Sequence, residues 1–277
     1  GVPYYQGKPI DVPLSTFYGF KNADYEKTDT HIVTAKAKHI FENGWALNST
    51  LRYGDYARDV APTAPRLVLS STGGVLTDAT QVNRNRPERN GTEKIAGFDV
   101  NMSGEFETGS IQHNILAGVD FAREDSKANR FAYTGVPPTT VGSPNPNDAF
   151  TSATRTHTSA TDFVSNTMGL YAQNLIEFTP QLKLLTGLRW DYFSGDYNTT
   201  NPSATANCGG TPLAIGQACQ TERTDRIWSY RTGLIYQPTL KQSYYVSYGT
   251  SFNPSGEAYA LDPRGSNTPP EKNRNIE

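Results

Sequence analysis

Residues 96–106 read AGFDVNMSGEF, and this stretch decides the fold of the chain. Apolar Ala96, Phe98, Val100, Met102 and Phe106 alternate with Gly97, Asp99, Asn101, Ser103 and Glu105. Successive side chains of a strand point to opposite faces, so this period of two predicts a strand with one apolar and one polar face. The turn Thr108-Gly109-Ser110 joins it to a return strand at 111–121 with the same alternation.

Three more hairpins of this kind are predicted, one before the first and two after it. They occupy residues 30–53, 168–192 and 228–252, with short turns at 42–44, 180–181 and 237–242. Long polar loops separate the hairpins, and we expect them at 1–27, 60–92, 126–160 and 256–270. Residues 273–277 are expected to begin a further strand.

The regular exchange of short turns and long loops favours a transmembrane barrel. A solvated face of a soluble β-sandwich also accepts charges such as Lys36, Asp99 and Arg189, so charge on the second face alone does not separate the two folds. Short turns on one side of the membrane and long loops on the other are typical of outer-membrane barrels. The predicted fold is therefore all-β: an antiparallel transmembrane β-barrel, present in part as about eight strands.

Composition agrees with this fold. The 277 residues have a mean hydropathy of −0.59, and no stretch approaches the roughly 20 apolar residues of a membrane helix. The aromatic residues are numerous (16 Tyr, 12 Phe and 3 Trp), as the interfacial girdles of a barrel require. The net charge of −2 argues against a nucleic-acid partner.

The two cysteines, Cys208 and Cys219, share one polar loop. An even number in a loop favours a disulfide and an oxidising compartment, and two unrelated thiols are the alternative. No histidine or second cysteine pair lies nearby in the sequence to complete a metal site.

Motifs of enzymes are missing from the sequence. It has no phosphate-binding glycine loop, no HExxH and no nucleophile elbow. The inward carboxylates Asp99 and Asp120 have the chemistry of an acid–base pair, but a solvated lumen wall explains them better. His31 and His39 share a face eight residues apart, too far to ligate one metal, and read as interfacial polar residues. The chain is expected not to be an enzyme.

The two ends of the chain carry a family resemblance. Residues 244–254 read YYVSYGTSFNP and residues 269–277 read PPEKNRNIE, and near the start stand STFYG at 15–19 and NSTLRY at 48–53. With the strand arrangement, these stretches resemble TonB-dependent siderophore receptors of the outer membrane, in their catecholate-type branch. The resemblance covers essentially the whole chain.

This resemblance implies a 22-strand barrel with an N-terminal plug, of which residues 1–277 are expected to be part of the barrel domain. The signal peptide, TonB box, plug and closing strands of the family lie outside these residues, and neither end reads as a natural terminus. The implied function is energised uptake of a ferric siderophore in the bacterial outer membrane. The implied partners are the TonB–ExbB–ExbD system, acting through the missing N-terminal region, and outer-membrane lipid and lipopolysaccharide.

Ligand-binding candidates follow from the implied cargo, which is bulky, anionic and aromatic. Guanidinium groups and aromatic rings in outer loops suit it by charge, stacking and cation–π contact. The candidates are Tyr4, Tyr5, Arg84, Arg86, Arg89, Arg130, Phe131 and Tyr133. The run at 84–89 is the densest basic segment, and contact with anionic lipopolysaccharide is its alternative role. No cofactor is expected, since iron enters only within the siderophore.

Several rival functions stay open from the sequence. A passive porin shares the architecture, although porins favour shorter strands. A secreted adhesin or carbohydrate-binding module predicts solubility without detergent. Within the receptor family, haem, cobalamin, a hydroxamate siderophore or a saccharide are alternative ligands.

Overall fold

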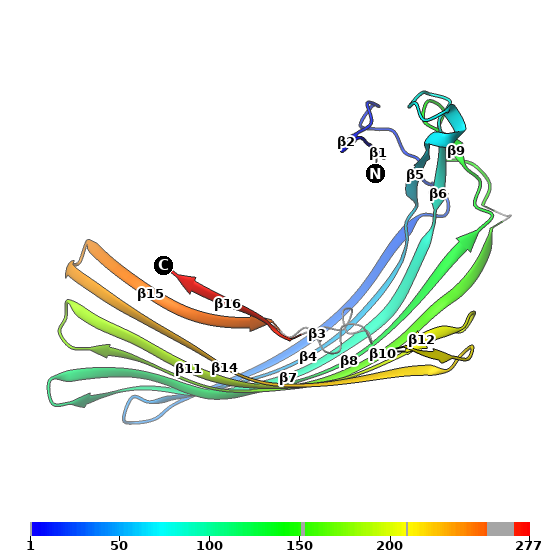
Figure 1. Ribbon diagram of the computed structural model, residues 1–277. Coiled ribbons are helices and arrows are strands. Elements are labelled where there is room, and N and C mark those ends of the chain that lie inside the picture. The colour runs from blue at the N-terminus through cyan, green and yellow to red at the C-terminus, as the bar shows by residue number, and fades with distance from the viewer. Residues whose placement is uncertain (1, 151–152, 209, 254–268) are drawn as a thin grey trace.

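The computed structural model describes residues 2–150, 153–208, 210–253 and 269–277. Its main element is one antiparallel sheet in the order β16-β15-β14-β11-β10-β8-β7-β4-β3, so that strands consecutive along the chain lie side by side. The strands are β3 (Tyr25–Ile40), β4 (Ala46–Ala61), β7 (Pro87–Thr108), β8 (Ile111–Thr134), β10 (Thr154–Glu177), β11 (Leu182–Thr200), β14 (Ala218–Thr239), β15 (Gln242–Asn253) and β16 (Glu271–Ile276). Figure 1 shows this sheet bent into an open trough.

The eight predicted strands and the start of a ninth are confirmed, but most strands are longer than the sequence indicated. β7 has 22 residues and β10 has 24, although about 9–11 residues cross a bilayer. The predicted boundaries were wrong where outward apolar residues give way to polar ones. Beyond that point the ladder continues, because backbone pairing does not require an apolar face. The predicted loop 256–270 lies mostly outside the described residues.

The convex face of the sheet carries an exposed apolar band. Aromatic residues near the short turns form one edge of the band: Phe41, Phe106, Phe178, Tyr236 and Tyr244. Aromatic residues nearer the long connections form the other edge: Tyr53, Phe98, Phe121 and Trp228. Exposed aliphatic residues such as Leu51, Met102 and Leu188 lie between these edges. This distribution is that of a barrel wall facing lipid.

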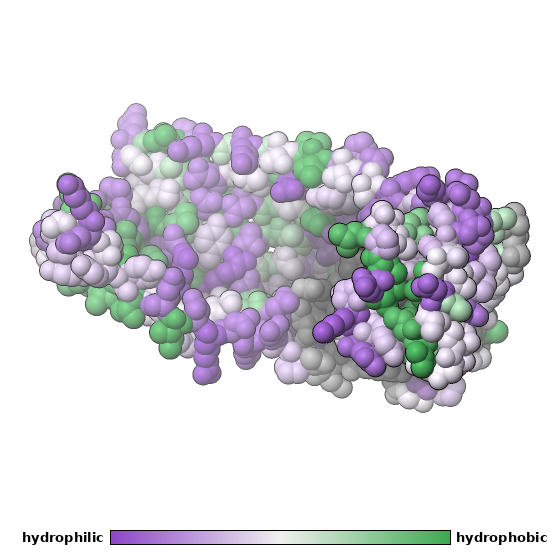
Figure 2. Space-filling model, turned by 90° about the horizontal axis from the view of Figure 1, so that it is seen from above, coloured by the Kyte–Doolittle hydropathy of each residue, from purple (hydrophilic) through white to green (hydrophobic). Residues whose placement is uncertain are grey.

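The concave face is polar, as predicted. Figure 2 looks onto this face and shows hydrophilic side chains along much of the trough. Side chains from non-adjacent strands meet here: the Tyr171 hydroxyl on β10 reaches over β8 and donates to Asp99 on β7 at 2.8 Å. Glycines allow this reach. A Cβ at Gly118 would stand 2.6 Å from Tyr171 Cζ, and one at Gly169 would stand 2.6 Å from Asp120 Oδ2.

The connections at one end of the sheet are not the plain loops expected at 1–27, 60–92 and 126–160. They contain β1 (Tyr4–Tyr5), β2 (Lys8–Pro9), β5 (Ala64–Val68), the 3-10 helix η1 (Leu69–Thr72), β6 (Gln81–Asn85) and β9 (Thr139–Thr140). Strands β5, β6 and β9 form a sheet of their own above the trough (Figure 1). Within the described part of the chain, no helix is long and apolar enough to cross a membrane.

These connections fold into one cap with its own small core. Ile10, Tyr18, Val82 and Val141 are buried together. The Tyr18 hydroxyl donates to the carbonyl of Val141 at 2.9 Å, and burial raises the pKa of this phenol. The N-terminal segment and two inter-strand connections are therefore fixed to one another by side-chain packing.

Candidate ligand-binding site

A pocket of about 590 Å³ opens on the concave face, between the apolar band and the cap. Most of its lining residues, Arg58, Arg89 and Arg130 among them, have the inward parity of β3, β4, β7 and β8. The lining includes three guanidinium groups and a single carboxylate, contributed by Arg58, Arg89, Arg130 and Glu93. We name this site the inner pocket. Its excess of positive charge suits an anionic ligand.

The three arginines of the inner pocket differ in their partners. Arg58 pairs with Glu26, with 2.8 Å between Arg58 Nη2 and Glu26 Oε1. Arg89 and Arg130 are Cα partners across the β7–β8 ladder, and both are exposed. Neither forms an ion pair or side-chain hydrogen bond with another described residue. The two free guanidinium groups therefore lie side by side on the inner face.

An aromatic cluster lies on the same face, beside the pocket. Phe163, Phe193 and Tyr197 are buried together on β10 and β11. Phe163 is the Cα partner of Ser126, and the next inward residue of β8, Ala128, lines the pocket. This cluster was not predicted from the sequence, because the predicted strands began at 168 and ended at 192, short of the observed ends of β10 and β11. The signal was present in the sequence: the alternation continues past 168 and 192, with aromatic residues at the inward-facing positions.

Arg84 and Arg86, two of the three arginines in the basic run at 84–89, are buried under the cap. Arg84 Nε donates to the carbonyl of Pro137 at 2.7 Å, its Nη1 donates to that of Asn145 at 3.0 Å, and its guanidinium pairs with Asp148. Its guanidinium carbon lies 4.1 Å from the Phe20 ring centroid. These bonds occupy the groups that a ligand would use.

Arg86 is held in a similar way. Its guanidinium pairs with Asp24, donates to the carbonyl of Ala23 and stacks on Phe150 with 4.6 Å to the ring centroid. Together with Arg84, it joins the N-terminal segment to the β8–β10 connection. The structure thus gives Arg84 and Arg86 a place inside the cap rather than on a surface open to a ligand.

Tyr133 and Phe131 lie on β8 rather than in a loop, and they face away from the trough. The Tyr133 hydroxyl donates to Glu88 at 2.6 Å, and Arg155 donates to the same carboxylate. Arg155 also lies over Phe131 at 3.4 Å from the ring centroid. Glu88 stands beyond the apolar band, and the hydrogen bonds from Arg155 hold its pKa below the usual range.

Tyr4 and Tyr5 lie in the β1–β2 hairpin of the cap. Tyr4 is 69% exposed, whereas Tyr5 packs partly against the cap core. Tyr4 is therefore accessible, but the structure does not bring it to the lining of the inner pocket.

The carboxylates weighed as an acid–base pair are saturated by other side chains. Asp99 and Asp120 are Cα partners on the β7–β8 ladder. Arg189 binds both oxygens of Asp120, at 2.7 and 3.0 Å, and Asp191 at 2.7 Å. Asp99 accepts from Tyr171 and from Asn101. Neighbouring side chains thus hold both carboxylates, an arrangement that fits a polar lumen wall.

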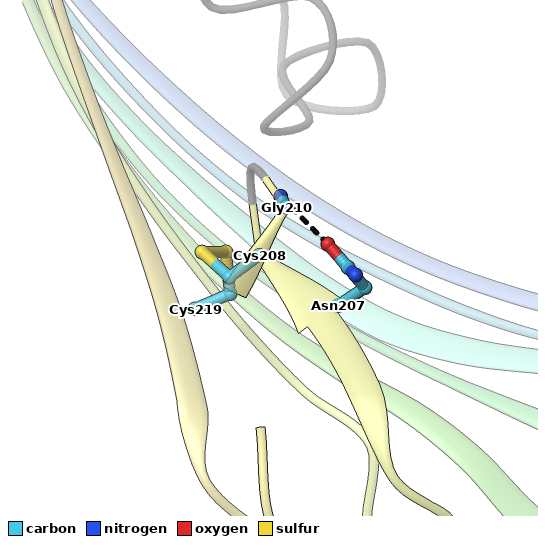
Figure 3. Close-up of a disulfide and its surroundings, with 4 residues drawn as sticks. All are labelled: Asn207, Cys208, Gly210 and Cys219. Atoms are coloured by element: carbon cyan, nitrogen blue, oxygen red, sulfur yellow. Dashed lines mark hydrogen bonds between the residues drawn. A yellow bond between two sulfur atoms is a disulfide. The ribbon is translucent and has the colours of Figure 1, made fainter. Parts of the chain in front are cut away.

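Cys208 and Cys219 form a disulfide in the structure, with 5.5 Å between their Cα atoms. Figure 3 shows it next to the turn of the hairpin formed by β12 (Ala206–Cys208) and β13 (Thr211–Leu213), tying this hairpin to β14. In the hairpin turn, the Gly210 N–H donates to Asn207 Oδ1 at 2.7 Å. Across the described residues, His, Cys, Asp and Glu form no group of three that would hold a metal ion.

Comparison with known proteins gives one family. The profile of the TonB dependent receptor-like β-barrel family matches residues 2–277. Among curated proteins, the siderophore receptor PiuA of Acinetobacter baumannii is 24% identical over 92% of this chain and 36% of that protein. The catecholate siderophore receptor Fiu of Escherichia coli K12 is 24% identical over 92% of this chain and 35% of that protein. The chain thus spans about a third of the length of these relatives.

Solved structures show the same fold. The crystal structure of PiuA superposes with a TM-score of 0.80 at 21% identity, covering 100% of this chain and 42% of that one. The closed form of Fiu superposes with a TM-score of 0.72 at 23% identity, covering 89% of this chain and 36% of that one. The nine-stranded sheet therefore corresponds to part of a closed receptor barrel.

Proposed function

This chain belongs to the family of TonB-dependent receptor β-barrels, and on that premise we propose that the full-length protein imports a ferric siderophore of catecholate type. Proteins of this family are outer-membrane receptors that transport their ligands and are not enzymes. Capture at the outer end of the barrel would precede passage through the lumen, energised by the TonB system. Iron is cargo within the siderophore and not a resident cofactor.

The observation that carries the proposal is the combination of charge and aromatic surface on one face. The inner pocket offers three guanidinium groups, and the aromatic cluster of Phe163, Phe193 and Tyr197 lies beside it. A ferric tris-catecholate complex is anionic at its centre and aromatic at its rim. Guanidinium groups and aromatic rings attract such a ligand by charge and by stacking. The name of Fiu points to a catecholate siderophore, and the name of PiuA points to a siderophore.

Below the pocket, the lumen wall supports transport of a polar solute. Asp99, Asp120, Arg189 and Tyr171 satisfy one another along this wall. Groups that are already paired interact weakly with a passing ion, so they present a hydrated surface without a strong trap.

Contact with anionic lipid is proposed for a different set of residues from the run at 84–89. Lys94, Arg123 and Lys127 are exposed on the convex face, above the apolar band. This level faces the headgroups of the outer leaflet, where lysine and arginine side chains meet the phosphates of lipopolysaccharide.

Uptake of radioactive iron by a receptor-deleted strain tests the proposal. Cells that produce the full-length protein should accumulate iron from a ferric tris-catecholate complex, and deletion of TonB should abolish this uptake. Uptake that persists without TonB would establish a passive porin instead. If cells take up haem or cobalamin but no iron from any ferric siderophore, the proposed ligand class is wrong.

A further inference from the structure

Two pairs of like charges stand on the inner face of a single β-ladder, and the protein treats them differently. Asp99 faces Asp120, and Arg89 faces Arg130, each as Cα partners of β7 and β8. Like charges directly opposite each other destabilise a pair of strands. Each pair therefore needs an opposite charge nearby.

The protein supplies that charge to the acidic pair only. Arg189, Tyr171 and Asn101 all bind Asp99 or Asp120. Arg89 and Arg130, by contrast, have no ion pair or side-chain hydrogen bond with any other residue that the structure describes. The nearest carboxylate along β7 on their face is Glu93, four residues from Arg89 or about 13 Å along the strand. It faces Ser126 and Tyr56 rather than either arginine.

We propose that Arg89 and Arg130, here named the arginine pair, act together as a clamp for one multiply charged anionic group of the ligand. The clamp rests on the proposed function, because it selects among ferric complexes by charge. A tris-catecholate complex of ferric iron is trianionic, whereas a tris-hydroxamate complex is neutral. Two planar guanidinium forks bind neighbouring oxyanions in bidentate fashion, and the bound anion also removes their mutual repulsion. A polyanion therefore gains both the bonds to the two guanidinium groups and the relief of their repulsion. A neutral complex does not gain this charge-dependent stabilisation.

The position of the arginine pair fits this role. Both side chains line a pocket of about 590 Å³ that opens into the trough. The inward parity of β7 and β8 directs them to the lumen, where outer-leaflet lipid does not reach. Both are exposed, so a ligand replaces water at the guanidinium groups without breaking an ion pair or side-chain hydrogen bond to another described residue.

Binding titrations on the full-length receptor in detergent test the clamp. The variants are Arg89→Gln, Arg130→Gln and the double variant, and Arg66→Gln, an exposed arginine on β5, is the matched control. Each single variant should weaken the trianionic complex about tenfold, as expected for loss of a charge-assisted hydrogen bond. The double variant should lose less than the product of the two, because both arginines bind one group. Binding of a neutral tris-hydroxamate complex, where detectable, should not change.

Thermal unfolding without ligand gives an independent readout. Because either single substitution removes the repulsion, both variants should unfold at the wild-type temperature or above it. Unchanged affinity of the double variant for the trianionic complex, with wild-type binding intact, would overturn the clamp.

Failure of the proposed function gives a distinct result. If the wild-type receptor binds no ferric siderophore, pyrophosphate becomes the probe for the arginine pair. Pyrophosphate binding that the double variant abolishes would support the clamp without the siderophore. Its absence in the wild type, or its persistence in the double variant, would refute the clamp.

Discussion

Two like-charged pairs lie on the inner face of the β7–β8 ladder, each as Cα partners: the acidic pair of Asp99 and Asp120, and the arginine pair of Arg89 and Arg130. The first lies at the level of the apolar band and is bound by side chains of β7, β10 and β11. The second lies above that band and is left to solvent. The difference shows that two like-charged pairs in the same register relation can be paired with other side chains in one place and left to solvent in another.

The largest effect is expected when the acidic pair loses its cationic partner, so that it lacks a counter-charge as the arginine pair does. Arg189→Met removes the cation from Asp120 and Asp191 while keeping much of the side-chain volume. We expect the free energy of unfolding of the full-length barrel in detergent to fall by about 2–3 kcal/mol, because carboxylates lose their partner in a partly buried site.

Two further variants control this measurement. Arg231→Met, on the inner face of β14 and bonded to the neutral Gln173, should change stability by about 0.5 kcal/mol or less. Adding Asp120→Asn to Arg189→Met should restore part of the loss. Equal effects of Arg189→Met and Arg231→Met would show that the acidic pair needs no compensation.

A smaller effect is expected from making the pocket still more positive. Glu93→Gln removes the single carboxylate among the lining residues. The affinity for a trianionic ferric complex should rise about two- to threefold, since Glu93 lies about 13 Å along the strand from Arg89 and a charge at that distance in a solvated site acts weakly. Glu107→Gln is the control on the same strand and face, at the turn end of β7. An equal gain in both variants would point to net charge rather than to the pocket.

The smallest effect concerns Glu88, the chain neighbour of Arg89 on the opposite face. Its folded-state pKa is held below the free value of 4.5 by Arg155. Its stabilisation is therefore complete above the unfolded pKa and is lost as the pH falls through the folded pKa. The thermal midpoint of wild type should exceed that of Glu88→Gln at neutral pH, and the gap should close in acid. A gap of constant size would contradict the ion pair with Arg155.

The sequence predicted the strands and faces well, because alternation is a local signal. It placed Asp99 and Arg189 on the polar face and Phe98 and Trp228 on the apolar one, as the structure has them. The strand ends were not predicted, because the outward residues become polar above the apolar band although the backbone pairing continues.

The candidate site was predicted only in part. Arg84 and Arg86 look like Arg89 in the sequence, and only the folding of the cap over them separates their roles. Burial of this kind depends on Phe20, Asp24 and Asp148, which are distant in sequence. The pairing of Arg89 with Arg130 depends on the register of β7 and β8, which the turn at 108–110 fixes once both strands are known to be long.

The glycines of the concave face also affect how far its side chains project from the sheet. The space where a Cβ would stand is filled by Tyr171 at Gly118, and by Arg189 and Asp120 at Gly169. These side chains therefore lie down against the backbone instead of standing up into the lumen. In the import function proposed above, a bulky solute would gain clearance at these points. Larger residues at Gly118 or Gly169 would act as a constriction, limiting the size of what passes rather than its charge.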